Sequence, residues 1–290
     1  MSRRLALGTV QFGLRYGIAN EIGQVDRVQA AAILEHARAA AVDTLDTAIG
    51  YGESERRLGE IGVAGWQIVS KLPAIPDSCA DVSRWVNESL DGSLSRLGVP
   101  RLYGLLLHRS QDLLGPNGSA LHRAMLAVKE EGRVQKIGVS VYGPDELATV
   151  LSKFSLDLVQ SPFNIVDRRL AGSGWLHRLN ESGIEVHVRS IFLQGLLLMP
   201  AAARPAKFRH WQPLWDRWHQ WLQETQLTPL QACLAFALSP PEVARVVVGV
   251  DSLPQLQEIL RAVDAPRTAT PRALMSEDVN LINPSRWSTN

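Results

Sequence analysis

Short apolar runs alternate with amphipathic stretches along nearly the whole chain, and this pattern predicts strands separated by helices. The eight apolar runs that have the length of buried strands cover residues 5–10, 42–47, 66–71, 102–108, 134–140, 156–161, 184–190 and 244–250. Between these runs, residues 28–40, 82–98 and 119–132 carry apolar side chains three and four positions apart, as expected of helices that cover a sheet with one face.

Eight strand–helix units predict an α/β fold, a (β/α)8 TIM barrel, formed by residues 1–290 as a single domain with the barrel itself at about 4–263. A doubly wound open sheet is the alternative. That fold usually carries a G-x-G-x-x-G turn after its first strand, and the glycines of residues 8–17, GTVQFGLRYG, do not fit this pattern. We therefore favour the barrel.

Two segments depart from a plain barrel. Residues 192–228 are far longer than the usual connection of about 2–6 residues between a strand and its helix. A long helical insertion after the seventh strand is predicted there by four tryptophans at helical spacing: Trp211, Trp215, Trp218 and Trp221. The tail at about 266–290 is rich in Pro, Ser, Thr and Arg, and we expect it to be an extended segment over the barrel surface.

Composition and charge indicate which kind of partner the protein binds. Hydrophobic residues make up 46% of the chain, enough for a large core, and the formal net charge is only +1. Acidic and basic residues are interspersed, which argues against a nucleic-acid or membrane partner and favours a small molecule. The sequence leaves a homo-oligomer open.

The cysteines and the apolar runs bear on localisation. Cys79 and Cys233 are too few for a disulfide framework and lack a metal-binding spacing, so we expect free thiols. The first residues, MSRRLALGTVQFG, do not develop a signal-peptide core, and no apolar run approaches the ~20 residues of a membrane span. We expect a cytoplasmic protein.

Polar side chains follow three successive strands of the predicted barrel. Asp46 and Tyr51 lie in DTAIGYG at the end of the second run, Lys71 ends the third and His108 ends the fourth. A parallel barrel exposes these strand ends to its substrate. Each residue alone has an ordinary structural explanation, as a turn, core or solvated residue, but their conjunction predicts an active site.

In this order and context the four residues resemble the catalytic tetrad of the aldo-keto reductases. The resemblance covers roughly residues 5–263 and is also strong at GVS, 138–140. It implies a (β/α)8 barrel that reduces an aldehyde, ketone or open-chain sugar with a nicotinamide dinucleotide and without a metal. Because the first predicted strand begins at about residue 5, we expect the barrel to lack the β-hairpin that closes its bottom in the family.

Carbonyl reduction assigns a task to each member of the tetrad. Tyr51 supplies a proton, and a nearby ammonium, Lys71, is expected to bring the phenol pKa of about 10 closer to working pH. Asp46 keeps the buried lysine charged. His108 hydrogen-bonds the carbonyl oxygen and orients it.

The resemblance also assigns the cofactor site. Ser140 and Gln160 match positions that hold the nicotinamide carboxamide, and LQGLL at 193–197 and GVDS at 249–252 match segments that hold the pyrophosphate and the adenosine end. The residues expected to bind cofactor are Ser140, Gln160, Arg189, Ser190, Gln194, Gly195, Leu196, Gly249, Asp251, Ser252 and Gln255.

Two positions differ from well-known members of the family. Val141 replaces an asparagine that many members carry, which removes one hydrogen bond to the carboxamide. Arg189 replaces an aromatic residue that often stacks on the nicotinamide; its guanidinium plane could stack as well, or form a salt bridge at the strand end.

The choice of cofactor rests on the segment after strand eight. Family grounds favour NADP(H), but Asp251 would repel a 2′-phosphate, so NAD(H) competes. Ser252 and Gln255 also form the S-x-x-Q pattern of a capping box, and the helix that it begins could hold a phosphate through backbone amides.

Two other functions compete with the reductase. A cofactor-binding accessory subunit is the main alternative, although it would not need a tuned tyrosine and lysine. A metal-dependent barrel hydrolase would need clustered ligands, and His108 and His187 lack further partners. For the substrate pocket we expect contributions from Tyr16, Arg109 and at least one insertion tryptophan acting as a lid.

Overall fold

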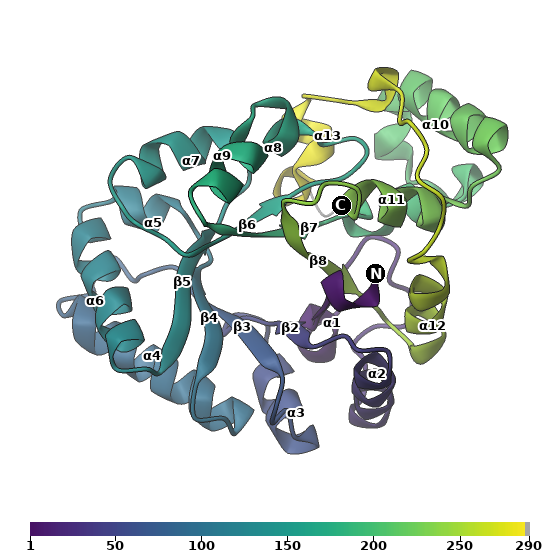
Figure 1. Cartoon of the computed structure of the whole chain (residues 1–290). Helices are drawn as coiled ribbons and strands as arrows, with labels where there is room; N and C mark the ends of the chain where they lie inside the picture. The colour runs from purple at the N-terminus through teal and green to yellow at the C-terminus, as the bar shows by residue number, and fades with distance from the viewer. Residues whose placement is uncertain (288–290) are drawn as a thin grey trace.

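A closed barrel of eight parallel strands organises the computed structural model, which describes residues 1–287 (Figure 1). The strands are β1 (Leu5–Gly8), β2 (Thr44–Asp46), β3 (Gln67–Leu72), β4 (Leu102–Leu107), β5 (Val134–Ser140), β6 (Leu158–Pro162), β7 (Glu185–Arg189) and β8 (Val243–Gly249). Each strand pairs with its neighbour in sequence, and β8 closes the ring on β1. All eight predicted strands are present, and the predicted TIM barrel is confirmed.

Helices surround the barrel, as Figure 1 shows. The eight that follow the strands are α2 (Arg27–Ala39), α3 (Ser54–Ile61), α4 (Val82–Leu97), α6 (Gly118–Glu130), α7 (Pro144–Leu151), α9 (Trp175–Glu181), α11 (Pro229–Ala237) and α12 (Leu253–Ala262). Shorter helices are α1 (Val10–Gly13), α5 (Gln111–Leu114) and α8 (Arg169–Gly172). In the described part of the chain, no helix combines the length and apolar character needed to cross a membrane.

The first strand is shorter than predicted, since it ends at Gly8 and Val10 begins α1. Gly13, which ends α1, packs its backbone closely against the backbone at Tyr51. A Cβ atom on Gly13 would lie 1.7 Å from the carbonyl oxygen of Tyr51, so only glycine fits there. The chain thus turns into α1 to support the loop that carries Tyr51.

The amino-terminal end of the barrel is tied by Arg4, in the short 3-10 turn η1 (Ser2–Arg4). Its guanidinium donates to the carbonyl oxygens of Leu238 at 2.7 Å, Pro240 at 2.6 Å and Val243 at 2.7 Å. These acceptors lie at the end of α11 and the start of β8. One side chain therefore links the first strand to the last.

A second hydrophobic core lies outside the barrel. The segment after β7 contains η2 (Leu193–Leu198), η3 (Ala201–Ala203), η4 (Ala206–Trp211) and the predicted helical insertion, α10 (Gln212–Thr225). Trp215 is fully buried in this core, and Trp218 and Trp221 stack with ring centroids 5.7 Å apart. Trp211 ends η4 instead of belonging to the same helix.

The tail packs on this second core; in Figure 1 one yellow turn of it lies beside α10, whereas α13 (Val279–Ile282) is drawn apart from that helix. The tail forms η5 (Arg272–Leu274), α13 and η6 (Pro284–Arg286), so it is more structured than the extended segment that we predicted. Leu274, Leu281 and Ile282 are buried in the same hydrophobic cluster as the tryptophans. Apolar positions in the tail are too sparse to show a helical period, so the sequence pattern did not predict these turns.

Candidate active site

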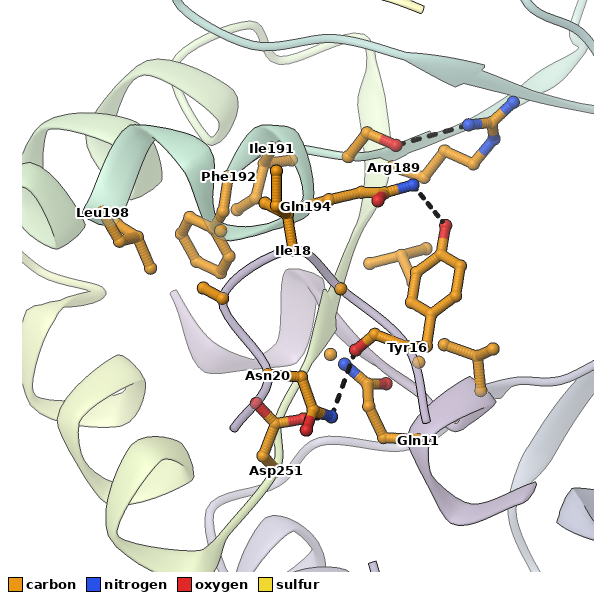
Figure 2. A pocket seen from close by; sticks show the side chains of 18 of the residues that line it. Gln11, Tyr16, Ile18, Asn20, Arg189, Ile191, Phe192, Gln194, Leu198 and Asp251 are labelled. Carbon is orange, nitrogen blue, oxygen red and sulfur yellow. Dashed lines mark hydrogen bonds between the residues drawn. The ribbon is translucent and has the colours of Figure 1, made fainter. Parts of the chain in front are cut away.

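A cavity of about 1110 Å³ opens at the carboxyl ends of the strands. It runs from Tyr51 and His108, near the barrel axis, to Ile259 and Ala262 of α12. Figure 2 shows its side chains converging from the loop after β1, the segment after β7 and the start of α12. An elongated space of this kind suits a long ligand that places one end among the strand ends.

The base of the site is a buried ion pair. Asp46 ends β2 and Lys71 lies in β3, and Lys71 Nζ donates to both Asp46 carboxylate oxygens at 2.8 Å and to the Thr47 carbonyl oxygen at 2.8 Å. The Lys71 side chain is only 1% exposed. Its three N–H donors are thus all used, which is what a buried ammonium requires. Burial lowers the pKa of Lys71, and the Asp46 carboxylate opposes that effect.

Tyr51 is held by the turn that follows β2. Its backbone N–H donates to the Ala48 carbonyl oxygen at 3.0 Å, and its own carbonyl oxygen accepts from the Ser54 backbone N–H at 3.1 Å. The Ser54 hydroxyl in turn donates to the Thr9 carbonyl oxygen at 2.8 Å. These bonds, with the close approach of Gly13, fix the tyrosine relative to β1.

Tyr51, His108 and Lys71 meet as predicted. The rings of Tyr51 and His108 are arranged edge to face with centroids 5.6 Å apart, and Lys71 Nζ lies 5.1 Å from the Tyr51 ring centroid. Both rings line the cavity. The four members of the proposed tetrad therefore form one cluster.

The pKa of Tyr51 moves in the direction opposite to the one predicted. Burial, followed by the negative charge of Asp46, raises it well above the ordinary value. The ammonium of Lys71 does not reverse this effect, because Asp46 already neutralises it and its donors point to other acceptors. Burial, with the charges of Lys71 and Arg189, lowers the pKa of His108 to about 4, so this ring is neutral at neutral pH.

Gln160 joins the ion pair to the cavity. From β6 its Nε2 donates to Asp46 Oδ1 at 2.6 Å, a contact across the barrel that the sequence did not suggest. The residue is fully buried, and its Oε1 atom has no hydrogen-bond partner within residues 1–287. Gln160 and its strand neighbour Ser140 both line the cavity. Because Gln160 lines the cavity, an amide N–H of a bound ligand would suit this unsatisfied acceptor.

Arg189 occupies the end of β7 beside Ser140. Its Nε donates to Ser140 Oγ at 3.4 Å and its Nη2 to the Val141 carbonyl oxygen at 3.0 Å. The guanidinium lies 5.2 Å from the centroid of the Tyr142 ring. Within the described chain no carboxylate oxygen lies within 4.0 Å of its nitrogens, so the alternative of a strand-end salt bridge is not found.

A bridge crosses the cavity, and sequence reasoning missed most of it. Tyr16 and Gln194 meet through a 3.1 Å hydrogen bond from Gln194 Nε2, and the Ile18 backbone donates to the Gln194 carbonyl oxygen at 3.2 Å. On the other side Asn20 Nδ2 donates to Asp251 Oδ1 at 2.8 Å. Figure 2 shows the contact between Gln194 and Tyr16 and places Asn20 next to Asp251. The two side-chain contacts join residues 178 and 231 positions apart, and no local pattern marks them.

The start of α12 differs in one detail from a capping box. The Ser252 hydroxyl accepts from the Gln255 backbone N–H at 3.4 Å, as predicted. The Gln255 Oε1 atom, however, accepts from the backbone of Asp251 and not from Ser252. Asp251 and Gln255 line the cavity, whereas Ser252 does not.

The remaining residues predicted for the site lie partly in the cavity and partly outside it. Ser190, Gln194, Gly195 and Gly249 line the cavity, but Leu196 is buried in the second core. Arg109 is exposed and lies 3.8 Å from Asp112, so it does not contribute the expected polar contact.

The predicted tryptophan lid is wrong. None of the four insertion tryptophans lines the cavity. Trp215 donates to the Phe208 carbonyl oxygen at 2.9 Å, and Trp211 donates to Asp278 in the tail at 3.0 Å. Their indole groups are used to pack the insertion and the tail together.

The donor set fits a nicotinamide dinucleotide. Gly8 and Gly249 are paired in register at the ends of β1 and β8, so the cavity floor between them is backbone. A Cβ atom on Gly249 would lie 2.5 Å from Gln11 Nε2, so a side chain there would have to displace the Gln11 amide. Gln11 Oε1, like Gln160 Oε1, is buried without a partner among the described residues. Within residues 1–287 no group of three or more His, Cys, Asp or Glu side chains could hold a metal ion.

Comparison with known proteins agrees with this geometry. The family model of the aldo/keto reductase family matches residues 4–273. The chain is 24% identical to the NADH-specific methylglyoxal reductase of Escherichia coli K12, over 94% of each protein, and 23% identical to an uncharacterized oxidoreductase of Bacillus subtilis over 63% of this chain and 61% of the relative.

A solved structure shows the same fold. The holo form of an aldo-keto reductase from Bacillus halodurans superposes with a TM-score of 0.73 at 20% identity, covering 95% of this chain and 94% of that one. The family match extends over almost the entire barrel, and the strand ends carry the predicted tetrad. The chain is therefore an oxidoreductase that belongs to the aldo/keto reductase family.

Proposed function

We propose that this enzyme reduces the carbonyl group of a small aldehyde or ketone with NADH, using Tyr51 as the proton donor. The observation that carries the proposal is the cluster of Tyr51 and His108 in one cavity above the buried Asp46–Lys71 pair. A reduced nicotinamide held in the cavity supplies the hydride. The protein supplies the proton and the orientation.

Each side chain has a distinct task in the proposed reaction. Tyr51 is neutral at working pH because its pKa is raised, so it holds the proton that the carbonyl oxygen needs. His108 is neutral as well and donates a hydrogen bond that orients the same oxygen. Lys71 Nζ lies 5.1 Å from the centroid of the phenol ring; although its pairing with Asp46 leaves the resting pKa of Tyr51 raised, its ammonium partly offsets the negative charge that develops as the proton leaves, and Asp46 holds Lys71 in place.

The cofactor is held by residues further along the cavity. Ser140 and Gln160 bind the carboxamide, with the unpartnered Gln160 Oε1 as acceptor for its N–H. The backbone floor at Gly8 and Gly249, together with Gln194, accommodates the pyrophosphate. These assignments extend the cofactor residues that the sequence suggested.

NADH is favoured over NADPH by the charges near α12. Among the described residues, Asp251 and Glu258 line this part of the cavity together with a single cation, Arg261. A 2′-phosphate would add negative charge beside two carboxylates. The similarity to a methylglyoxal reductase named as NADH-specific supports the same choice, and we therefore propose NADH in place of the NADPH expected on family grounds.

The direct test is oxidation of NADH and NADPH in the presence of a panel of aldehydes, ketones and aldoses that includes methylglyoxal. We expect turnover with at least one 2-oxoaldehyde or small aldehyde, and faster turnover with NADH. Dinucleotide binding without oxidation by any member of the panel would instead identify an accessory, cofactor-binding protein.

The charge of Asp251 is expected to set the preference between NADH and NADPH. Asp251→Lys should raise the relative kcat/KM for NADPH by roughly 1–2 kcal/mol, because it removes repulsion and adds attraction. Asp251→Asn is the matched control, since it removes the charge and retains an oxygen that accepts from Asn20. An NADPH to NADH ratio that stays constant in both variants would mean that Asp251 does not face the 2′-position.

A further inference from the structure

Arg189 carries a positive charge that no contact among the described residues balances. Its hydrogen-bond partners are the hydroxyls of Ser140 and Ser190 and the carbonyl oxygen of Val141, and all three are neutral. The Tyr142 ring that it contacts is neutral too. A guanidinium keeps its charge at any working pH, so the charge is permanent.

The other charged groups at this end of the cavity cancel. Lys71 is paired with Asp46, and the sum of the two is zero. Tyr51 and His108 are both neutral at neutral pH. The reaction end of the cavity, as the described residues form it, therefore carries one net positive charge, and that charge belongs to Arg189. The second cation that lines the cavity, Arg261, is at the far end, on α12.

Arg189 lies beside the groups proposed to hold the nicotinamide carboxamide. It donates to Ser140, and Ser140 is paired in register with Gln160 on the adjacent strand. In the view of Figure 2, Arg189 and Asp251 are at opposite ends of the pocket, which separates this charge from the adenosine end. A ring held by Ser140 and Gln160 is thus close to the guanidinium.

The nicotinamide ring changes charge in the reaction. It is neutral when reduced and carries one positive charge when oxidised. A fixed positive charge next to it raises the free energy of the oxidised form alone. The face of an aromatic ring at the same position would instead attract the cationic, oxidised form.

We propose that Arg189 is a redox-state selector, a binding residue that makes the site hold NADH more tightly than NAD⁺. This inference rests on the proposed function, because it assigns the nicotinamide to Ser140 and Gln160. It gives a purpose to the arginine that replaces the stacking aromatic residue. An enzyme with this property binds its reductant in the presence of NAD⁺, releases the oxidised product readily and is a poor catalyst of alcohol oxidation.

The test is equilibrium binding of NADH and NAD⁺ to the purified protein, with NADH followed by its fluorescence and NAD⁺ by calorimetry. The quantity to compare is the ratio of the NAD⁺ to the NADH dissociation constant. One unit charge close to the ring, partly screened by solvent, corresponds to about a tenfold effect on this ratio. We expect the ratio to exceed about ten in the wild type and to fall about tenfold in Arg189→Gln.

Two control variants separate charge from structure. Arg189→Lys retains the charge and should keep the wild-type ratio, even if both ligands bind more weakly. Arg261→Gln removes the cation on α12 and should also leave the ratio unchanged, because the two ligands share the same adenosine end. Arg189→Met provides a second neutral variant, whose result does not depend on how a polar amide packs at this position.

The outcomes distinguish the inference from the proposed function. A wild-type ratio near one, or a ratio that is the same in the wild type and in both neutral variants, overturns the role of Arg189 while leaving a dinucleotide site intact. Failure of the wild type to bind either dinucleotide overturns both the proposed function and this inference.

Discussion

Tyr51→Phe is expected to lower kcat by about 10²- to 10⁴-fold, the usual contribution of a general acid to a rate. The substitution removes the phenolic proton and retains the ring. Its edge-to-face contact with His108 at 5.6 Å should persist, so the cavity should keep its shape. Steady-state oxidation of NADH with the best carbonyl substrate measures the effect.

Binding supplies the control for this experiment. The affinity of Tyr51→Phe for NADH should stay within a fewfold of the wild type, because Tyr51 is not among the groups that we assign to the cofactor. If the variant turns over at a rate close to that of the wild type with any good substrate, another group donates the proton and the proposed mechanism is wrong.

Lys71→Met is expected to abolish turnover and also to destabilise the fold. The substitution leaves the Asp46 carboxylate buried without its cation, and breaking a buried pair in this way typically costs about 3–5 kcal/mol of unfolding free energy. Methionine is close to lysine in length, so packing changes little. Urea unfolding and kcat, measured on the same samples, give the two effects.

A double variant separates the two effects of Lys71. Lys71→Met combined with Asp46→Asn removes both charges and keeps an oxygen that can accept from Gln160. We expect it to recover at least about 2 kcal/mol of the lost stability, as a coupled pair should in a double-mutant cycle. Activity should stay low. Recovery of turnover in the double variant would show that Lys71 has no catalytic task beyond neutralising Asp46.

The sequence predicted the barrel and most of the tetrad because these depend on local signals. A buried parallel strand is a short apolar run, and the residue that ends it must lie at the open end of the barrel. This rule alone places Asp46, Lys71 and His108. Tyr51 lies in the turn after β2 and not at a strand end, so the rule does not place it. Only the glycines around it indicate that turn in the sequence.

Features that depend on long-range packing could not be predicted in the same way. The contact between Gln160 and Asp46 spans the barrel, and that between Asn20 and Asp251 joins residues 231 positions apart. The pKa of Tyr51 depends on how completely the fold removes it from water, which no motif encodes.

The packing partner of the helical insertion is another feature that the sequence did not predict. Helical spacing of the tryptophans indicated an apolar face but not what covers it. In the structure η5 of the tail packs on α10, and Leu274 is buried in the same hydrophobic cluster as the indoles. None of the four tryptophans lines the cavity, so the expected lid does not exist.

The uneven placement of the indoles has a practical consequence for spectroscopy. Five of the eight tryptophans belong to the second core or pack against it, whereas Trp66, Trp85 and Trp175 are the three that pack on the barrel core. Intrinsic emission is therefore weighted towards α10 and the tail. A melting curve recorded by fluorescence therefore reports mainly the unfolding of α10 and the tail. A curve recorded by far-ultraviolet circular dichroism reports mainly the helices around the barrel. A fluorescence midpoint at a lower temperature than the circular dichroism midpoint would show that the insertion and tail open before the barrel does.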